Sequence, residues 1–243
     1  MDDREFILQK NESLTAAVYR MVLAGDVSGI RPGQFVNVLL PGFYLRRPIS
    51  VCDAENGELT LIYKVVGHGT AQMAALSPGA ALKLLCPLGN GYDPTKAGDA
   101  PLLLGGGVGV PPLYYLAKEL RREGKAVSVV LGFNTKNEVF YEEAFRDLGC
   151  AVTVTTADGS YGTRGFVTDA LPDRISFFYT CGPLPMLKAV CKAVGAPGEV
   201  SLEERMGCGF GACVGCTHKT ASGFQRVCKE GPVFRKEVLL WED

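Results

Sequence analysis

Four of the nine cysteines lie near the carboxyl end of the chain with the spacing C-x4-C-x2-C-x11-C: Cys208, Cys213, Cys216 and Cys228. The stretch MGCGFGACVGC (206–216) around the first three also holds four glycines. A segment so rich in glycine can hardly pack a hydrophobic core, so we expect the thiolates to hold it around a metal centre. The spacing matches plant-type [2Fe–2S] centres, in which four thiolates bind two irons.

A structural zinc site is the alternative. Zinc ligands usually come as two C-x2-C knuckles or include paired histidines, whereas this chain has one C-x2-C and only His68 and His218. The glycines also let backbone N–H groups approach the sulfurs, which an iron–sulfur loop needs more than a zinc knuckle does. The pattern therefore favours a [2Fe–2S] cluster. Because such a cluster moves one electron at a time, we expect the rest of the chain to bind a two-electron partner, a flavin.

Two different patterns of apolar and polar residues divide the rest of the chain. Up to Gly98, short alternating runs such as GQFVNVLLPG (33–42) are broken by turn residues, which predicts an antiparallel β-barrel with one short helix at 70–76. From Ala100, apolar strands alternate with amphipathic helices, which is typical of a doubly wound parallel α/β sheet. Strands are expected at 102–104, 126–131, 151–156, 175–182 and about 199–202, and helices at 111–123, 137–148 and 183–196. We expect three domains: a flavin-binding barrel (1–98), a nucleotide-binding α/β domain (99–198) and a small cluster domain (199–243).

The barrel half carries two candidate flavin motifs. RRPIS (46–50) follows a strand, so Arg47 is suited to pairing with a phosphate and Ser50 to bonding a flavin ring nitrogen. An isolated Arg-Pro pair is also typical of an exposed charged turn. Further on, IYKVVGHGT (62–70) places a glycine turn before a short helix, which suits a diphosphate.

The α/β half carries two candidate nucleotide motifs. In LLLGGGVGVPPL (102–113), a buried strand leads through glycines to a helix that begins with proline, where backbone N–H groups are suited to a pyrophosphate. The pattern is G-x-G-x-x-P, and no Asp or Glu ends the next strand near Leu131 to bind a ribose, so the motif does not separate NAD from NADP. TCGPLPM (180–186) closes a later strand, which places Cys181 either against a nicotinamide or as a buried spectator thiol.

Charge and composition exclude some partners. A net charge of −1 gives no electrostatic footprint for nucleic acid. The start MDDREFILQK is acidic and lacks a long apolar segment, so we expect no secretory signal. The longest uncharged run, 100–117, is interrupted by glycines and prolines and is expected to be a soluble strand, loop and helix. We therefore expect a cytoplasmic chain that binds no membrane.

Taken in chain order, the motifs R-P-x-S, G-G-G-x-G-x-P-P and C-G-P-x-x-M resemble the ferredoxin–NADP reductase superfamily. The carboxyl-terminal ERMGCGFGACVGC (204–216), with its distant fourth cysteine, is similar to a narrower family, the electron-transfer subunits of class 1B dihydroorotate dehydrogenases. The likeness covers essentially the whole chain. Ile49 departs from the wider superfamily, where many members have a tyrosine that stacks on the flavin, and agrees with the narrower family.

The resemblance implies FAD, one [2Fe–2S] cluster and NAD as the electron acceptor. The implied FAD contacts are Arg47, Pro48, Ile49, Ser50, Ile62, Tyr63, Lys64, Gly69 and Thr70. The implied cluster ligands are Cys208, Cys213, Cys216 and Cys228. On the nucleotide side the candidates are Gly105, Gly107, Gly109, Cys181 and Gly182. No residue of this chain is expected to be an acid, base or nucleophile.

The resemblance also implies a partner, an FMN-containing catalytic subunit that oxidises dihydroorotate to orotate in de novo pyrimidine biosynthesis, in a heterotetramer with two copies of each chain. Electrons would pass from that FMN through the cluster to FAD, and then as a hydride to NAD⁺. Two alternatives remain open on the residues alone. One is a reductase subunit of another NAD(P)-linked complex, such as a sulfhydrogenase or a bifurcating transhydrogenase, and the other is a zinc-stapled nucleotide-binding sensor.

Overall fold

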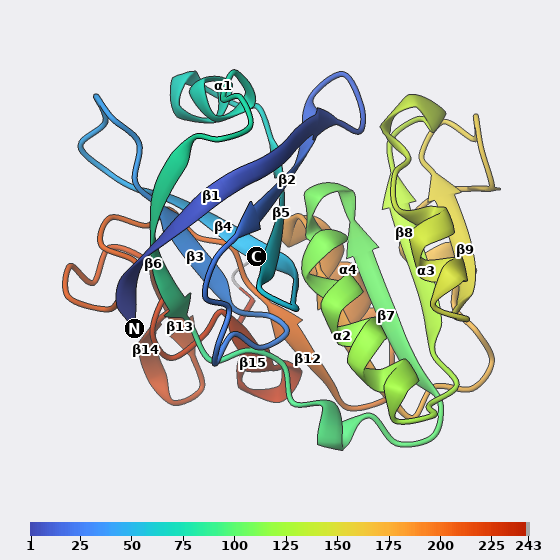
Figure 1. Cartoon of the computed structure of the whole chain (residues 1–243). Helices are drawn as coiled ribbons and strands as arrows, with labels where there is room; N and C mark the ends of the chain where they lie inside the picture. The colour runs from blue at the N-terminus through green and yellow to red at the C-terminus, as the bar shows by residue number, and fades with distance from the viewer. Residues whose placement is uncertain (242–243) are drawn as a thin grey trace.

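A computed structural model describes residues 1–241, in which a β-barrel lies beside an α/β sheet (Figure 1). The barrel is closed, with the order β1-β2-β5-β4-β3-β6 and antiparallel neighbours. Its strands are β1 (Asp2–Ser13), β2 (Val18–Ala24), β3 (Phe35–Val38), β4 (Arg47–Glu55), β5 (Glu58–Lys64) and β6 (Ala81–Leu88). In β6 every second side chain is buried, as the alternating sequence predicts, so the barrel fold is confirmed.

One helix, α1 (His68–Ala74), lies between β5 and β6. It begins two residues earlier than the sequence predicts, because Thr70 is the third residue of the helix and not its first. The Thr70 hydroxyl accepts hydrogen bonds from the N–H groups of Val66 (2.9 Å) and Gly67 (3.3 Å) and donates to the Gly67 carbonyl (3.1 Å). The hydroxyl of Thr70 is therefore used within the turn that opens the helix.

The second half of the chain forms a seven-stranded sheet with the order β10-β9-β8-β7-β11-β12-β15. Its strands are β7 (Pro101–Gly106), β8 (Ser128–Phe133), β9 (Ala151–Thr156), β10 (Thr163–Arg164), β11 (Phe177–Cys181), β12 (Gly198–Ser201) and β15 (Val233–Arg235). All neighbours are parallel except β12 and β15. The parallel α/β fold expected from the sequence is thus confirmed, with one antiparallel strand at its edge.

Three helices cover the two faces of this sheet: α2 (Pro111–Arg122), α3 (Glu142–Asp147) and α4 (Leu184–Ala193). Leu103 of β7 packs in the same core as residues of α2 and α3, whereas its neighbours Leu102 and Leu104 pack with residues of α4. Because side chains alternate along a strand, α4 lies on the face opposite to α2 and α3. Both faces are covered, which explains the apolar run of β7.

The helix predicted at 137–148 is wrong in its first half. The structure has a 3-10 turn at Lys136–Glu138 and α3 begins only at Glu142. Between them Tyr141 has a φ of 65°, which breaks the helical path. The rings of Phe140 and Tyr141 pack edge to face against Phe133 and other rings of the core, so tertiary packing overrides the helical periodicity there.

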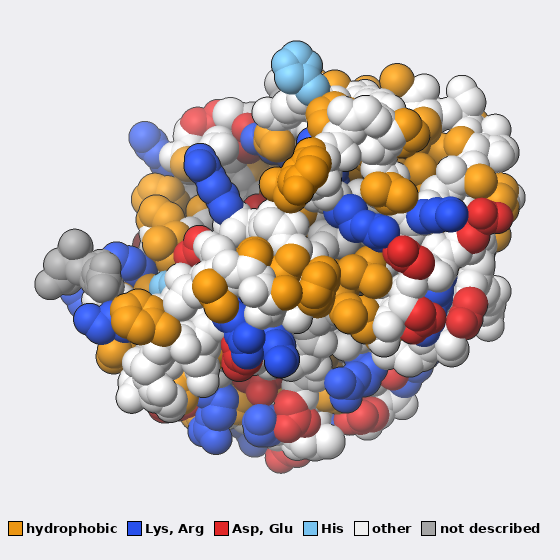
Figure 2. Space-filling view, turned by 90° about the vertical axis from the view of Figure 1, so that its left-hand side faces the viewer, with side chains coloured by type: hydrophobic (Ala, Val, Ile, Leu, Met, Phe, Trp, Pro, Cys, Tyr) orange, Lys and Arg blue, Asp and Glu red, His pale blue; other side chains and the backbone are white. Residues whose placement is uncertain are grey.

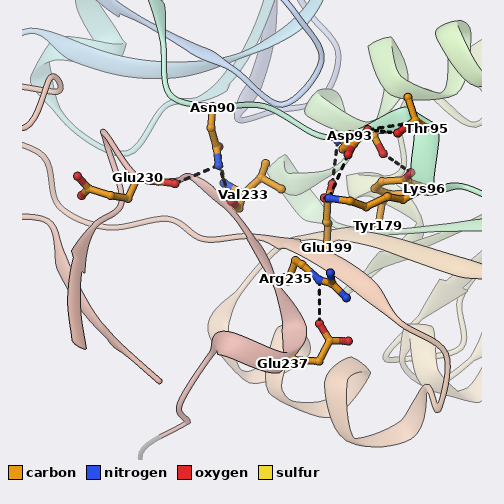
Figure 3. A network of polar contacts seen from close by, with 10 residues as sticks. All are labelled: Asn90, Asp93, Thr95, Lys96, Tyr179, Glu199, Glu230, Val233, Arg235 and Glu237. Atoms are coloured by element: carbon orange, nitrogen blue, oxygen red, sulfur yellow. Dashed lines mark hydrogen bonds and ion pairs between the residues drawn. The ribbon is translucent and has the colours of Figure 1, made fainter. Parts of the chain in front are cut away.

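The carboxyl-terminal segment is joined to the same sheet. It forms a hairpin of β13 (Thr217–Thr220) and β14 (Gly223–Arg226) and then adds β15 to β12. Figure 3 shows how polar contacts hold it: the Asn90 amide donates to the carbonyls of Glu230 (3.0 Å) and Val233 (2.7 Å). The domain boundaries at 98/99 and 198/199 stay a prediction.

The barrel and the sheet share a hydrophobic core. Cys52 and Ile62, on the outer face of the barrel, pack in one cluster with Leu113 of α2. At its edge the Lys118 ammonium lies 2.6 Å from carboxylate oxygens of both Asp53 and Glu55. These contacts fix the orientation of the two halves. No helix within residues 1–241 is long and apolar enough to cross a membrane.

Candidate functional site

We call residues 206–216 the cluster loop. This loop carries Cys208, Cys213 and Cys216, and Cys228 follows β14, so that the four predicted ligands lie as two pairs. Cys208 and Cys213 form one pair, because the N–H of Cys213 lies 3.4 Å from the Cys208 sulfur and the N–H of Cys208 lies 3.5 Å from the Cys213 sulfur. Cys216 and Cys228 form the second pair, because the N–H of Cys228 lies 3.4 Å from the Cys216 sulfur. Within residues 1–241, no three His, Cys, Asp or Glu side chains converge closely enough to hold a single metal ion. Two pairs of thiols suit two irons, each bound by two of the four thiolates.

The two pairs differ in exposure. Cys213 is exposed and Cys208 partly exposed, whereas Cys216 and Cys228 are each only 2% exposed. An iron bound by the first pair would therefore lie nearer the surface than an iron bound by the second. Phe210 and Val214, on the same loop, expose 44% and 59% of their surface. The outer rim of the loop is thus apolar.

The pKa values of the thiols differ in the same way. Burial raises the pKa of Cys208, but the backbone N–H groups of Cys213 and Phe210 outweigh it and lower that pKa to about 6, which favours the thiolate that binds metal. Burial and the neighbouring Cys216 thiol raise the pKa of Cys228 to about 12. The thiol of Cys228 is therefore neutral, and metal binding would release its proton.

Arg226 holds the cluster loop in shape. Its guanidinium donates to the carbonyl of Gly211 (2.8 Å) and pairs with the carboxylate of Glu230, which also accepts the Arg226 backbone N–H (2.8 Å). His218 faces Glu204 (3.7 Å between Nδ1 and Oε1) and the ring of Trp241. Arg226 is not among the residues predicted from the sequence, where its four-residue spacing from Glu230 was the available signal.

On the barrel, the two predicted flavin motifs meet. The Arg47 guanidinium lies against Gly69, at the first turn of α1, so closely that a Cβ at Gly69 would overlap with it. Its position is set by the carbonyl of Leu45, to which it donates (2.6 Å), and by the ring of Phe43, 4.5 Å from its centre. A cation beside a helix N-terminus suits a diphosphate, so these residues fit FAD.

The other predicted flavin residues lie on both faces of the barrel wall. Ser50 pairs with Phe35 of β3, and Ile62 packs with the core of the α/β half, so both are on the outer face. Tyr63 points inward, where its hydroxyl donates to Asn11 (3.1 Å) and burial raises its pKa to about 12. The side chain of Tyr63 therefore cannot contact a flavin outside the barrel, whereas its backbone can.

The remaining three predicted flavin residues lie on β4 and β5. Pro48 faces Asn37 across β3 and β4, and Ile49 packs against the barrel core. Lys64 is exposed at the end of β5. The flavin contacts of these side chains stay a prediction.

The two nucleotide motifs also meet, at the carboxyl ends of adjacent parallel strands. Gly105 of β7 pairs with Cys181 of β11, and Gly109 packs so tightly on the backbone of Cys181 and Gly182 that a Cβ there would overlap with it. Gly107 has a φ of 52° and open space around it. Burial raises the pKa of the Cys181 thiol to about 12, so the thiol is neutral. This edge of the sheet is where open α/β sheets bind nucleotides.

An acidic side chain does lie at the end of β8, although the sequence near Leu131 shows none. Glu138 folds back from the 3-10 turn, and its carboxylate accepts hydrogen bonds from the N–H (3.1 Å) and the side-chain amide (2.9 Å) of Asn134. It lies four residues beyond that asparagine in the chain. The N-x3-E spacing was the only sequence signal for it.

The cluster loop lies against the face of the barrel on which Pro48, one of the predicted flavin residues, is found. Asn37 of β3 is directly opposite Pro48 of β4, and its side-chain amide donates to the backbone carbonyl of Cys208 (3.1 Å). Asn37 is 1% exposed. The predicted flavin strand and the predicted cluster loop are thus linked through one side chain.

Comparisons with known proteins agree with this arrangement. Residues 203–240 match the family model described as the iron–sulfur cluster binding domain of dihydroorotate dehydrogenase B, and residues 103–192 match an oxidoreductase NAD-binding domain. A solved structure reported for flavin-based electron bifurcation by an NADH-dependent reduced ferredoxin–NADP oxidoreductase is similar to this chain, with a TM-score of 0.88 and 30% identity, over 97% of this chain and 90% of that one.

Two curated relatives are named dihydroorotate dehydrogenase B (NAD(+)), electron transfer subunit. The protein from Fusobacterium nucleatum is 45% identical, over 93% of this chain and 94% of its own length. The protein from Bacillus caldolyticus is 46% identical, over 99% of this chain and all of its own length. With likeness of this extent, the chain belongs to the family of dihydroorotate dehydrogenase B electron transfer subunits.

Proposed function

We propose that this chain carries electrons from an FMN-containing catalytic subunit, which oxidises dihydroorotate to orotate, to NAD⁺. The observation that carries the proposal is that three candidate sites occur together on one chain: the paired cysteines, the Arg47–Gly69 contact and the Gly109–Cys181 contact. The names of the curated relatives support the same activity. The pathway served is de novo pyrimidine biosynthesis.

In this proposal each site has one task. Cys208, Cys213, Cys216 and Cys228 hold the [2Fe–2S] cluster. Arg47 and the first turn of α1 hold the diphosphate of FAD, and Pro48, Ile49, Ser50, Ile62, Tyr63 and Lys64 line its ring system. FAD held there would supply the chemistry that joins two single electrons from the cluster and one proton into a hydride for NAD⁺.

NAD⁺ would bind at the carboxyl end of the sheet. Gly105, Gly107 and Gly109 let the backbone approach the nucleotide, while Cys181 and Gly182 lie where the nicotinamide would approach. The thiol of Cys181 is neutral, which suits a packing role better than proton transfer.

The cluster loop is the surface we propose for the catalytic subunit. It carries the exposed Cys213 with the apolar Phe210 and Val214. The loop lies on the left-hand side of Figure 1, the side that faces the viewer in Figure 2, where hydrophobic side chains extend across the middle of the surface. We propose a cytoplasmic complex with two copies of each subunit, which the mass of the purified complex would test.

Co-expression with a candidate FMN subunit tests the function. The anaerobically purified complex should contain FAD, iron and inorganic sulfide in this chain, and should form orotate and NADH in equal amounts from dihydroorotate and NAD⁺. A complex in which NAD⁺ reduction does not depend on this chain would contradict the proposal. Zinc in place of iron, with no flavin, would point to a nucleotide-binding sensor.

A second candidate function is a subunit of a bifurcating ferredoxin–NADP oxidoreductase. The likeness to such a structure over almost the whole chain favours it. That function predicts exchange of electrons among ferredoxin, NADH and NADP⁺, with no response to dihydroorotate. The same preparation assayed with both sets of substrates separates the two functions.

A further inference from the structure

Asn37 occupies the boundary between the two proposed redox sites. Its cross-strand partner is Pro48, and cross-strand partners share one face of a sheet, so Asn37 and Pro48 lie on the outer wall of the barrel. Val36 and Val38, on either side of Asn37, point into the barrel core. From this wall the Asn37 amide reaches the carbonyl of Cys208, which is 171 residues away in the chain.

The orientation of the Asn37 amide is determined by its partner. A backbone carbonyl accepts hydrogen bonds only, so the nitrogen end of the amide must face Cys208. The oxygen end is then buried, with no hydrogen-bond partner among the described residues. Gly209, with a φ of 79°, lies so close that a Cβ there would overlap with the amide nitrogen. The loop therefore approaches Asn37 as closely as a backbone can.

Burying an unpaired oxygen costs free energy, and an apolar side chain of similar size would avoid that cost. The stability of the fold therefore does not account for an amide at this position. The single bond that the amide makes, to a proposed iron ligand, does account for it.

We propose that Asn37 is a positioning residue, whose N–H group holds the cluster loop against the flavin strands and thereby sets the rate at which single electrons pass between FAD and the cluster. The inference rests on the proposed function. In the step concerned, NADH gives two electrons to FAD as a hydride and leaves as NAD⁺. One electron would then pass from the reduced flavin to the oxidised cluster, and the second would stay on the flavin.

The test uses the chain loaded with FAD and cluster, mixed anaerobically with excess NADH, with flavin and cluster reduction followed separately. In Asn37→Leu, we expect reduction of the flavin to stay within about twofold of wild type, while electron passage to the cluster slows about tenfold. The midpoint potential of the cluster should become more negative, because the positive end of an N–H dipole is removed from beside its ligand. The thermal midpoint of unfolding should not fall.

Gln34→Met is the matched control. Gln34 is another buried amide, 5% exposed, and it donates to the carbonyl of Gly89 (2.8 Å), away from the cluster loop. Its replacement should lower the thermal midpoint and leave both electron-transfer rates and the cluster potential unchanged. Asn37→Leu is therefore expected to change electron transfer without loss of stability, and Gln34→Met to lower stability without a change in electron transfer.

An Asn37→Leu variant with the wild-type rate of cluster reduction and the wild-type potential would overturn the inference. If the leucine variant does not take up the cluster, Asn37→Ser replaces it in the test. Serine is too short to reach Cys208, so this variant should show the same slower reduction of the cluster and the same more negative midpoint potential. If NADH does not reduce the cluster in the wild-type chain at all, the proposed function fails, and the role of Asn37 fails with it.

Discussion

At the scale of single residues, two neighbouring arginines have different tasks. Arg46 pairs with the carboxylate of Asp3 (2.6 Å), whereas Arg47 lies over Gly69 and, within residues 1–241, donates only to the nearby carbonyl of Leu45. A guanidinium without a carboxylate, beside the first turn of a helix, is suited to an anionic ligand. The RRPIS sequence indicates a phosphate-binding arginine, and the structure shows which of the two has the geometry for it.

Arg47→Ala should weaken FAD binding about tenfold or more, because a hydrogen bond to a charged group is worth about 1.5–3 kcal/mol. Titration of the flavin-free chain with FAD, followed by flavin fluorescence, measures the effect. Arg46→Ala is the matched control and should bind FAD within about twofold of wild type, since it loses only a surface ion pair. Equal affinities for FAD in both variants and the wild type would rule out the phosphate role.

Glu199 gives the fold a pH dependence. It is 4% exposed on β12, where it accepts the N–H of Asp93 (2.9 Å) and pairs with Lys96 (3.1 Å), as Figure 3 shows. Burial, only partly offset by these two partners, raises the pKa of its carboxyl. The folded chain thus holds this proton more tightly than the unfolded chain.

The stability contributed by the protonated form of Glu199 is therefore present below the unfolded pKa, about 4.3, and is lost as pH rises through the raised folded value. In Glu199→Gln, which keeps an acceptor for the Asp93 N–H, this loss should be absent. Urea unfolding at several pH values measures the difference between the two proteins. Glu58→Gln, at an exposed carboxylate of β5, controls for the removal of one charge. A difference between wild type and Glu199→Gln that does not vary with pH would contradict the assignment.

At the scale of elements, the proposed nucleotide site depends on the close contact between the loop after β7 and the end of β11. The loop after β7 meets the end of β11 at Gly109, where only a hydrogen fits against the backbone of Cys181. Gly109→Ala should destabilise this contact by about 1–3 kcal/mol, the usual cost of overpacking. The Michaelis constant for NADH should rise about tenfold, while FAD content stays unchanged.

Steady-state reduction of an artificial acceptor by NADH measures this prediction. Gly195→Ala is the control, because a Cβ at Gly195 meets nothing within 4 Å. It should leave the Michaelis constant unchanged. A Gly109→Ala variant that also binds NADH normally would mean that the two loops do not form the nucleotide site.

Much of the element order was predictable from sequence, for identifiable reasons. The alternation in β6 and the apolar run of β7 reflect one-sided and two-sided burial, which the residues record directly. The addition of β15 to β12 was not predictable, because three residues between turns carry no periodic signal. The contact of Asn37 with Cys208 was equally hidden, since it joins positions 171 residues apart.

At the scale of the whole molecule, the proposed function requires this chain to present its cluster to a catalytic subunit. The apolar rim of the cluster loop is suited to this, and burying a Phe side chain is worth about 1.5–3 kcal/mol. Phe210→Ser should therefore weaken binding of the catalytic subunit about tenfold or more, as measured by analytical ultracentrifugation. Phe166→Ser, at an exposed phenylalanine of the α/β half, is the control. Unchanged affinity in Phe210→Ser would move the interface away from the loop.

We propose that electrons from dihydroorotate reach FAD only through the cysteine-bound cluster, whereas NADH exchanges electrons with FAD directly. The most direct measurement compares both half-reactions of the complex in wild type, Cys213→Ser and the control Cys191→Ser, whose thiol lies on α4. In Cys213→Ser we expect NADH to reduce FAD at the wild-type rate, while NADH formation from dihydroorotate and NAD⁺ is lost. Cys191→Ser should retain both reactions. A Cys213→Ser complex that still couples dihydroorotate oxidation to NAD⁺ reduction would contradict the account.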